Sequence, residues 1–140
     1  MGEPYRIFYR QAKMTDLAQF IRDLNNTWLE GRFDDLHAYF NANVVMLPPG
    51  EVQPVVGVDA MVESYREFGS LGIVHSFEIL EVVVHEFGPL AVCQVSFVID
   101  YEMQARRFRE NGLEVYALDT SRETPQVVWR TQIPGRPPTA

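Results

Sequence analysis

The chain has 140 residues, of which 46% are hydrophobic and 12% aromatic. This composition suits one domain with a filled core and excludes a disordered chain. The formal net charge of -7 argues against nucleic acid as a partner, because phosphate binding needs basic clusters. The single cysteine, Cys93, excludes an intramolecular disulfide and, because it lies in an apolar run, is interpreted as a core residue.

The N-terminal segment Met1–Lys13 lacks the central apolar block of a signal peptide, and no stretch of the chain is apolar for long enough to span a bilayer. We therefore expect a cytoplasmic protein that does not contact membranes. Tyr5, Ile7, Phe8 and Tyr9 give this segment a short aromatic pattern, which leaves an extra strand, a dimer arm and a frayed tail open.

Helical periodicity dominates the first half of the chain. Thr15 is a suitable N-cap for an amphipathic helix that ends at Gly31. The apolar stripe of this helix is Leu17, Phe20, Ile21, Leu24 and Trp28. A second, shorter helix is predicted over Phe33–Phe40 and a third over Val58–Phe68.

Two apolar segments predict strands with irregular features. Val44–Leu47 is wholly apolar and predicts a strand buried on both faces, which ends at the prolines before Gly50. Ile73–Phe87 alternates like a strand, but its apolar set changes parity. This slip predicts a β-bulge near Ile79–Glu81 that bends the sheet.

The remaining strands follow from alternation and turn signals. Leu90–Met103 alternates between an apolar face, expected to point inward, and a polar face. The inward set is Ala91, Cys93, Val95, Phe97, Ile99 and Tyr101, and the outward set is Gln94, Ser96, Asp100 and Glu102. Asn111-Gly112 predicts a hairpin turn leading into Leu113–Thr120. Val127–Ile133 is the last predicted strand, and proline-rich 134–140 is predicted to be disordered.

This order of elements resembles the nuclear transport factor 2-like superfamily, and more closely its SnoaL-like, ketosteroid isomerase-related branch. The residues that carry the resemblance over 14–133 are Trp28, Gly31, Phe33, Asp34, Leu36, Tyr39-Phe40, Val44–Leu47 before Pro49-Gly50, Gly57 with Ala60, and Val128-Trp129-Arg130.

The resemblance implies an α+β, cone-shaped fold in which three N-terminal helices pack on a strongly bent, mixed or antiparallel sheet and enclose a pocket. It implies one domain over 14–133 and a homodimer formed through the open sheet face. Members include ketosteroid isomerases, polyketide cyclases, epoxide hydrolases, dehydratases and non-catalytic binders, so the fold does not fix the reaction. No cofactor is expected. The three histidines, His37, His75 and His85, lack metal-ligand spacing, so no metal is expected.

The catalytic reading of the resemblance weakens at one position. Steroid isomerases of the superfamily carry a carboxylate base at a position that, in an alignment anchored on Phe40, is occupied here by Pro48. Proline has no proton to exchange. The remaining weak acid–base candidates are His75, Asp100 and Tyr101. His75 shares the parity of the inward residues of its strand, although a hydrogen-bonded histidine near a strand end fits the pattern too. Asp100 lies on the polar face, which suits solvent or a dimer interface.

Bulky residues expected between helices and sheet form the predicted ligand pocket: Trp28, Tyr39, Met46, Tyr65, Phe97, Tyr101, Tyr116 and Trp129. Tyr65 and Tyr101 are preferred, because their hydroxyls would orient a polar group of a ligand. Three functions stay open: a binder of a small apolar or aromatic molecule, a cofactor-free isomerase, cyclase or dehydratase, and a non-catalytic interaction module.

Overall fold

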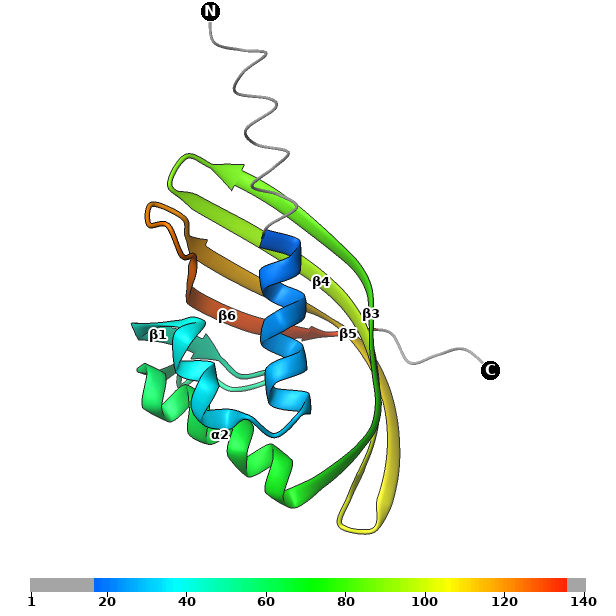
Figure 1. The fold of residues 1–140 in the computed structure, drawn as a ribbon. Coiled ribbons are helices and arrows are strands. Elements are labelled where there is room, and N and C mark those ends of the chain that lie inside the picture. Colours follow the sequence, from blue (N-terminus) through cyan, green and yellow to red (C-terminus); the bar gives the residue numbers. More distant parts are fainter. Residues whose placement is uncertain (1–16, 136–140) are drawn as a thin grey trace, which may run out of the picture.

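The computed structural model describes residues 17–135. These residues form a six-stranded mixed sheet in the order β2-β1-β6-β5-β4-β3, with helices on its concave side (Figure 1). The expectations for Met1–Lys13, for the Thr15 cap and for 136–140 fall outside the described residues. The extent of the predicted domain, 14–133, stays a prediction.

The two α-helices follow the predicted apolar stripes. The first covers residues 17–29, and its buried side chains include Leu17, Ile21 and Leu24. The second, α2 (Val58–Leu71), runs three residues beyond its predicted end. Tyr65 is among its buried residues.

The predicted helix over Phe33–Phe40 is wrong in type and length. The structure has a 3₁₀ helix, η1, over Phe33–Ala38, and Phe40 is already the first residue of β1. Phe40 pairs with Val127 of β6, and the Val127 N–H donates to the Tyr39 carbonyl. These sheet contacts end the helix early. The three predicted helices are thus two α-helices and one 3₁₀ helix within residues 17–135.

Strand β1 (Phe40–Leu47) pairs in parallel with β6 (Gln126–Pro134) and antiparallel with the short β2 (Val55–Val56). The expectation that Val44–Leu47 is buried on both faces is wrong, because only Val44 in this run is buried. The helices cover one face of the sheet (Figure 1), and Val45, Met46 and Leu47 are all partly exposed.

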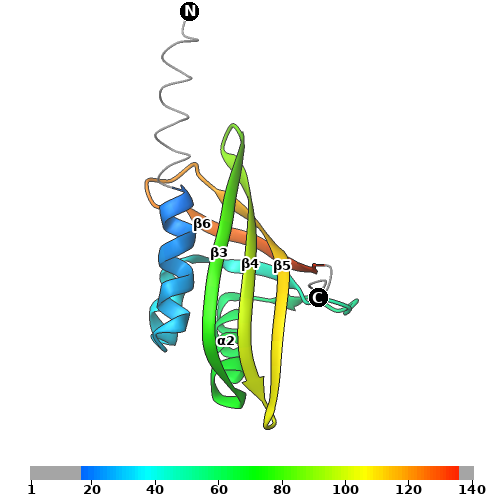
Figure 2. The same ribbon diagram turned by 90° about the vertical axis from the view of Figure 1, so that its right-hand side faces the viewer.

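Three long strands form the bent part of the sheet: β3 (Gly72–Phe87), β4 (Leu90–Met103) and β5 (Arg106–Asp119) (Figures 1 and 2). The register of β3 against β4 shifts between Ile79 and Glu81, which confirms the predicted bulge, and again between Val74 and Ser76. The inward face of β4 is confirmed by the alternating burial of its residues up to Ile99.

The predicted turn at Asn111-Gly112 is wrong. The β4–β5 turn lies at Gln104-Ala105, where φ values of 53° and 61° give the left-handed pair that a tight hairpin needs. The strand β5 continues through Gly112, which pairs with Phe97. A Cβ at Gly112 would lie 3.1 Å from Cζ of Phe97, so glycine there makes room for a ring.

The end of the described chain is also more ordered than predicted. Pro134 belongs to β6, and the Gly135 N–H donates to the Asn111 carbonyl at 2.9 Å. Within residues 17–135, no helix is both long and apolar enough to cross a membrane. The cytoplasmic location stays a prediction.

Candidate ligand-binding pocket

A cavity of about 230 Å³ lies between the helices and the concave face of the sheet. Its walls come from the first helix, α2 and five of the six strands. The lining residues are Trp28, Met46, Ser64, Tyr65, Phe68, Phe77, Phe97, Ile99, Tyr101, Glu110, Glu114, Arg130 and Gln132. An apolar wall with a few converging polar groups is the usual composition of a small-molecule site.

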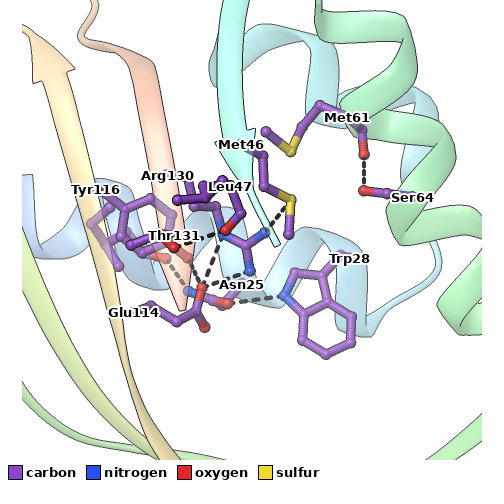
Figure 3. Close-up of polar contacts among 11 residues, drawn as sticks. Asn25, Trp28, Met46, Leu47, Met61, Ser64, Glu114, Tyr116, Arg130 and Thr131 are labelled. Atoms are coloured by element: carbon purple, nitrogen blue, oxygen red, sulfur yellow. Dashed lines mark hydrogen bonds and ion pairs between the residues drawn. The ribbon is translucent and has the colours of Figure 1, made fainter. Parts of the chain in front are cut away.

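The aromatic wall is built around Trp28. Its ring lies 5.9 Å from Tyr65, 6.1 Å from Phe68 and 5.5 Å from Phe77, measured between ring centroids. Trp28 Nε1 donates to Asn25 Oδ1 at 2.9 Å, which fixes the orientation of the indole (Figure 3). This hydrogen bond lies outside the cavity and fixes the central ring of the aromatic wall.

The polar floor is a buried ion pair between neighbouring strands. Arg130 donates to Oε2 of Glu114 from Nε at 3.1 Å and from Nη2 at 2.8 Å (Figure 3). The Tyr116 hydroxyl donates to the same oxygen, and Nη1 of Arg130 reaches Sδ of Met46 at 3.3 Å. Two further side chains, Tyr116 and Met46, thus help to fix this ion pair at the cavity wall.

An irregularity in β6 turns Arg130 inward. Ala117 pairs with Trp129 and Leu118 with Val127, so Val128 is an extra residue in this strand. The bulge reverses the alternation of faces. Arg130 is buried as Val127 is, whereas Trp129 is half-buried on the outer face.

The ion pair is embedded among tyrosine rings. The guanidinium of Arg130 lies 5.1 Å from the Tyr65 ring centroid and 5.7 Å from that of Tyr116. Burial lowers the pKa of Arg130, but Tyr65, Glu114 and Tyr116 together raise it well above its ordinary value. Arg130 is therefore a permanent cation, and its charge is balanced locally by Glu114.

Tyr65 lines the cavity, and its hydroxyl is buried. Burial raises the pKa of Tyr65 to about 12. The nearby Tyr116 side chain lowers the pKa of Tyr65. The two hydroxyls nevertheless lack the geometry of a hydrogen bond. Among residues 17–135, the Tyr65 hydroxyl has no hydrogen-bond partner.

A second polar pair lies at the mouth of the cavity. The Tyr101 hydroxyl donates to Oε1 of Glu110 at 3.0 Å. Burial, followed by this hydrogen bond, raises the pKa of Tyr101 to about 12. Glu110 also lines a neighbouring hollow of about 370 Å³ that shares Phe97 and Gln132 with the cavity. The two spaces therefore adjoin at Glu110.

The structure places five of the eight predicted pocket residues at the cavity: Trp28, Met46, Tyr65, Phe97 and Tyr101. The other three lie elsewhere. Tyr39 packs on Phe20 with ring centroids 5.2 Å apart, Tyr116 lies behind Glu114, and Trp129 is on the outer face.

The three acid–base candidates do not come together. Only Tyr101 lines the cavity. Of the two orientations left open for His75, the structure has the outward one, because the register shift between Val74 and Ser76 turns the side chain away from the cavity, with Nε2 3.5 Å from Oε1 of Glu102. Asp100 pairs with Arg107 at 2.6 Å on the outer face, and this contact lowers the pKa of Asp100.

Three charged residues of the cavity were missed in the sequence: Glu110, Glu114 and Arg130. A signal for Glu114 exists, since it shares the parity of Tyr116 and Leu118 and so places a charge on an apolar face. Arg130 gives no such signal, because the bulge at Val128 changes which residues of the strand face inward, and the sequence does not show where this bulge lies.

Other reactive groups lie away from the cavity. Cys93 is buried, as expected of a core residue, and burial followed by the nearby charge of Glu86 raises the pKa of its thiol to about 12. Within residues 17–135, no cluster of three or more His, Cys, Asp or Glu side chains is suited to holding a metal ion.

Comparison with known proteins places the chain by its fold. No family model matches the sequence, and no curated protein matches it. Solved structures do match. An NTF2-like protein from Cytophaga hutchinsonii superposes with a TM-score of 0.73 at 8% identity, over 86% of this chain and 97% of that one.

Two further structures agree. A ketosteroid isomerase-like protein from Erwinia carotovora atroseptica gives a TM-score of 0.70 at 16% identity, over 86% of this chain and 94% of the other. A protein from Catenulispora acidiphila in complex with S-DNPA gives 0.72 at 14% identity, over 89% and 94%. The chain therefore has the NTF2-like, ketosteroid isomerase-related fold, which confirms the resemblance at the level of the fold.

Proposed function

We propose that the cavity binds a small, largely apolar or aromatic molecule that carries at least one polar group. The observation that carries this proposal is Tyr65, which lines the cavity and whose buried hydroxyl has no hydrogen-bond partner among residues 17–135. An unpaired buried hydroxyl costs about 1–3 kcal/mol, which a ligand's hydrogen bond would offset.

The size and walls of the cavity suit such a ligand. A dry cavity of about 150 Å³ holds benzene in an engineered protein, and this one has about 230 Å³. Beside Tyr65, the guanidinium of Arg130 has five N–H groups, of which Glu114 and Met46 occupy three. Arg130 and Tyr65 therefore offer donors to an acceptor on the ligand.

A matched pair of serines on α2 gives the test. Ser64 lines the cavity and Ser70 is exposed, yet the hydroxyl of each donates a hydrogen bond to the carbonyl oxygen three residues earlier. Ser64→Phe fills the cavity, whereas Ser70→Phe adds the same ring outside it. We expect calorimetric binding of 2-naphthalenemethanol, an uncharged probe, to the wild type and to Ser70→Phe but at least tenfold weaker binding to Ser64→Phe.

Native mass spectrometry of freshly purified protein, compared with a denatured extract, provides a second readout. A released small mass carried by the wild type and Ser70→Phe, and absent from Ser64→Phe, would identify a natural ligand. Equal probe binding by both variants, or failure of the wild type to bind, would contradict the proposal.

The second candidate function is a cofactor-free acid–base enzyme, an isomerase, cyclase or dehydratase. The observation that favours it is the hydrogen-bonded pair of Tyr101 and Glu110 at the cavity, a proton donor beside a carboxylate. Loss of turnover in Glu110→Gln, with substrate binding retained, would support this function. A variant with unchanged turnover would exclude Glu110 from the chemistry.

The homodimer is proposed through the outer face of the sheet. On β4 this face carries the half-buried residues Val92, Gln94, Ser96 and Val98, a mixture of aliphatic and polar side chains suited to an interface. Ser96→Arg should give a monomer in light scattering, with Glu123→Arg in an exposed turn as the control. A Ser96→Arg protein that remains dimeric would place the interface elsewhere.

A further inference from the structure

The cavity is lined by more negatively charged than positively charged side chains. Two carboxylates, Glu110 and Glu114, line it beside one guanidinium, that of Arg130, which gives a formal charge of -1. Arg130 is already held by Glu114, with Nη2 2.8 Å from Oε2. An anionic ligand would compete with Glu114 for this guanidinium, and a buried carboxylate without its partner is strongly unfavourable.

Glu110 is the carboxylate that remains available. Within the part of the chain that the structure describes, it has no ion-pair partner, and its hydrogen bond comes from Tyr101 to Oε1. Oε2 is left to accept from a ligand. Because Tyr101 is held by stacking on Phe108, with centroids 5.2 Å apart, the carboxylate has a defined position at the junction of the two hollows.

The aromatic wall also favours a positively charged ligand. Six rings line the cavity, those of Trp28, Tyr65, Phe68, Phe77, Phe97 and Tyr101. The faces of aromatic rings carry negative potential and attract organic cations, most strongly at tryptophan. Rings and carboxylate together resemble in composition the aromatic sites that bind ammonium groups, and they repel a carboxylate ligand.

On the basis of the proposed function, we infer that the ligand is an organic cation, an amine on an aromatic or apolar frame. Its ammonium group lies at Glu110, and its frame lies against the rings around Trp28. The donors of Tyr65 and Arg130 at the floor would then hold an acceptor on the far side of the frame. The class of ligand is an alkyl or arylalkyl amine, protonated at neutral pH, that also bears a neutral oxygen or nitrogen acceptor.

Three probes with the same frame test the inference: 2-naphthylmethylamine, 2-naphthalenemethanol and 2-naphthoate, titrated calorimetrically near neutral pH and low salt. We expect the amine to bind about tenfold more tightly than the carboxylate, with the alcohol between them. Raising the salt to about 1 M should shrink this difference, because the screening length falls to about 3 Å.

The variant Glu110→Gln should bring the affinities of amine and alcohol to within about twofold of each other, because only the amine uses the charge. Glu78 is exposed as Glu110 is but does not line the cavity, so Glu78→Gln, which removes an equal charge, should preserve the preference. Naphthoate binding as tightly as the amine, or an unchanged preference in Glu110→Gln, would overturn the charge inference alone. Failure of all three probes to bind would overturn the proposed function with it.

Discussion

Arg130 lies directly opposite Tyr116 in the β5–β6 register, yet its guanidinium reaches diagonally to Glu114, one inward position along β5. The two charged side chains are 6% and 2% exposed. A diagonal pair of this kind cross-links the strands at the cavity wall, so the same contact serves the sheet and the site.

Breaking this ion pair from one side should destabilise the protein severely. In Arg130→Met the carboxylate of Glu114 stays buried without its partner, which costs about 3–5 kcal/mol in the free energy of unfolding. The double variant Glu114→Leu/Arg130→Met removes both charges and should recover much of that loss. Urea unfolding measures both values.

The exposed pair of Arg107 and Asp100 is the control for this prediction. Its removal by Arg107→Met should cost less than about 1 kcal/mol, because solvent screens it. A loss in Arg130→Met no larger than in Arg107→Met would mean that the buried pair does not stabilise the fold.

Replacement of Tyr65 by phenylalanine should separate binding from stability. The buried hydroxyl has no partner in residues 17–135, so its removal should not destabilise the fold and should raise the free energy of unfolding by about 1–3 kcal/mol. Binding of 2-naphthalenemethanol should weaken about fivefold or more, because one hydrogen bond to the ligand is lost. Tyr39→Phe, outside the cavity, should leave binding unchanged; equal effects of both variants would refute this role for Tyr65.

Alkaline pH should destabilise the fold through the same residue. The pKa of Tyr65 is about 12 in the folded protein and ordinarily 10.0. Because the unfolded chain loses this proton first, the contribution is fully present below pH 10 and is lost as the pH rises through about 12. Two pKa units correspond to about 3 kcal/mol. Urea unfolding across this interval should show a steeper decline for the wild type than for Tyr65→Phe, and parallel declines would contradict the assignment.

Enlarging Gly112 should reduce the cavity. In Gly112→Ala the new Cβ would lie 3.0 Å from the Ile133 carbonyl and 3.1 Å from Cζ of Phe97, so the ring must move. We expect a loss of about 1–3 kcal/mol in stability and weaker binding of the naphthalene probes. Ala117→Val, which enlarges a side chain on the opposite face of β5, should bind them normally. Unaltered binding by Gly112→Ala would show that Phe97 does not shape the site.

Local patterns predicted much of the fold because their cause is local. The stripe on residues 17–29, the alternation along β4 and the bulge at Ile79 each follow from burial of one face. Tyr65 and Trp28 were found for the same reason. Their helices face the sheet, and bulky inward residues meet there.

The errors arise where pairing between strands decides the conformation. Asn111-Gly112 has strong turn chemistry, but uninterrupted pairing of β4 with β5 moves the turn to Gln104-Ala105, which carries no glycine. The position of Arg130 depends on one unpaired residue in β6. In Val127-Val128-Trp129 all three side chains are apolar, so the sequence does not reveal where the faces exchange.

The bulge at Val128 therefore decides the chemical character of the cavity floor. With regular alternation from Val127, Trp129 would point inward and Arg130 outward, so that an indole would replace the guanidinium and Glu114 would lose its counter-ion. In a chain of this fold, a one-residue change of pairing register can thus convert a charged floor into an aromatic one without any substitution in the wall.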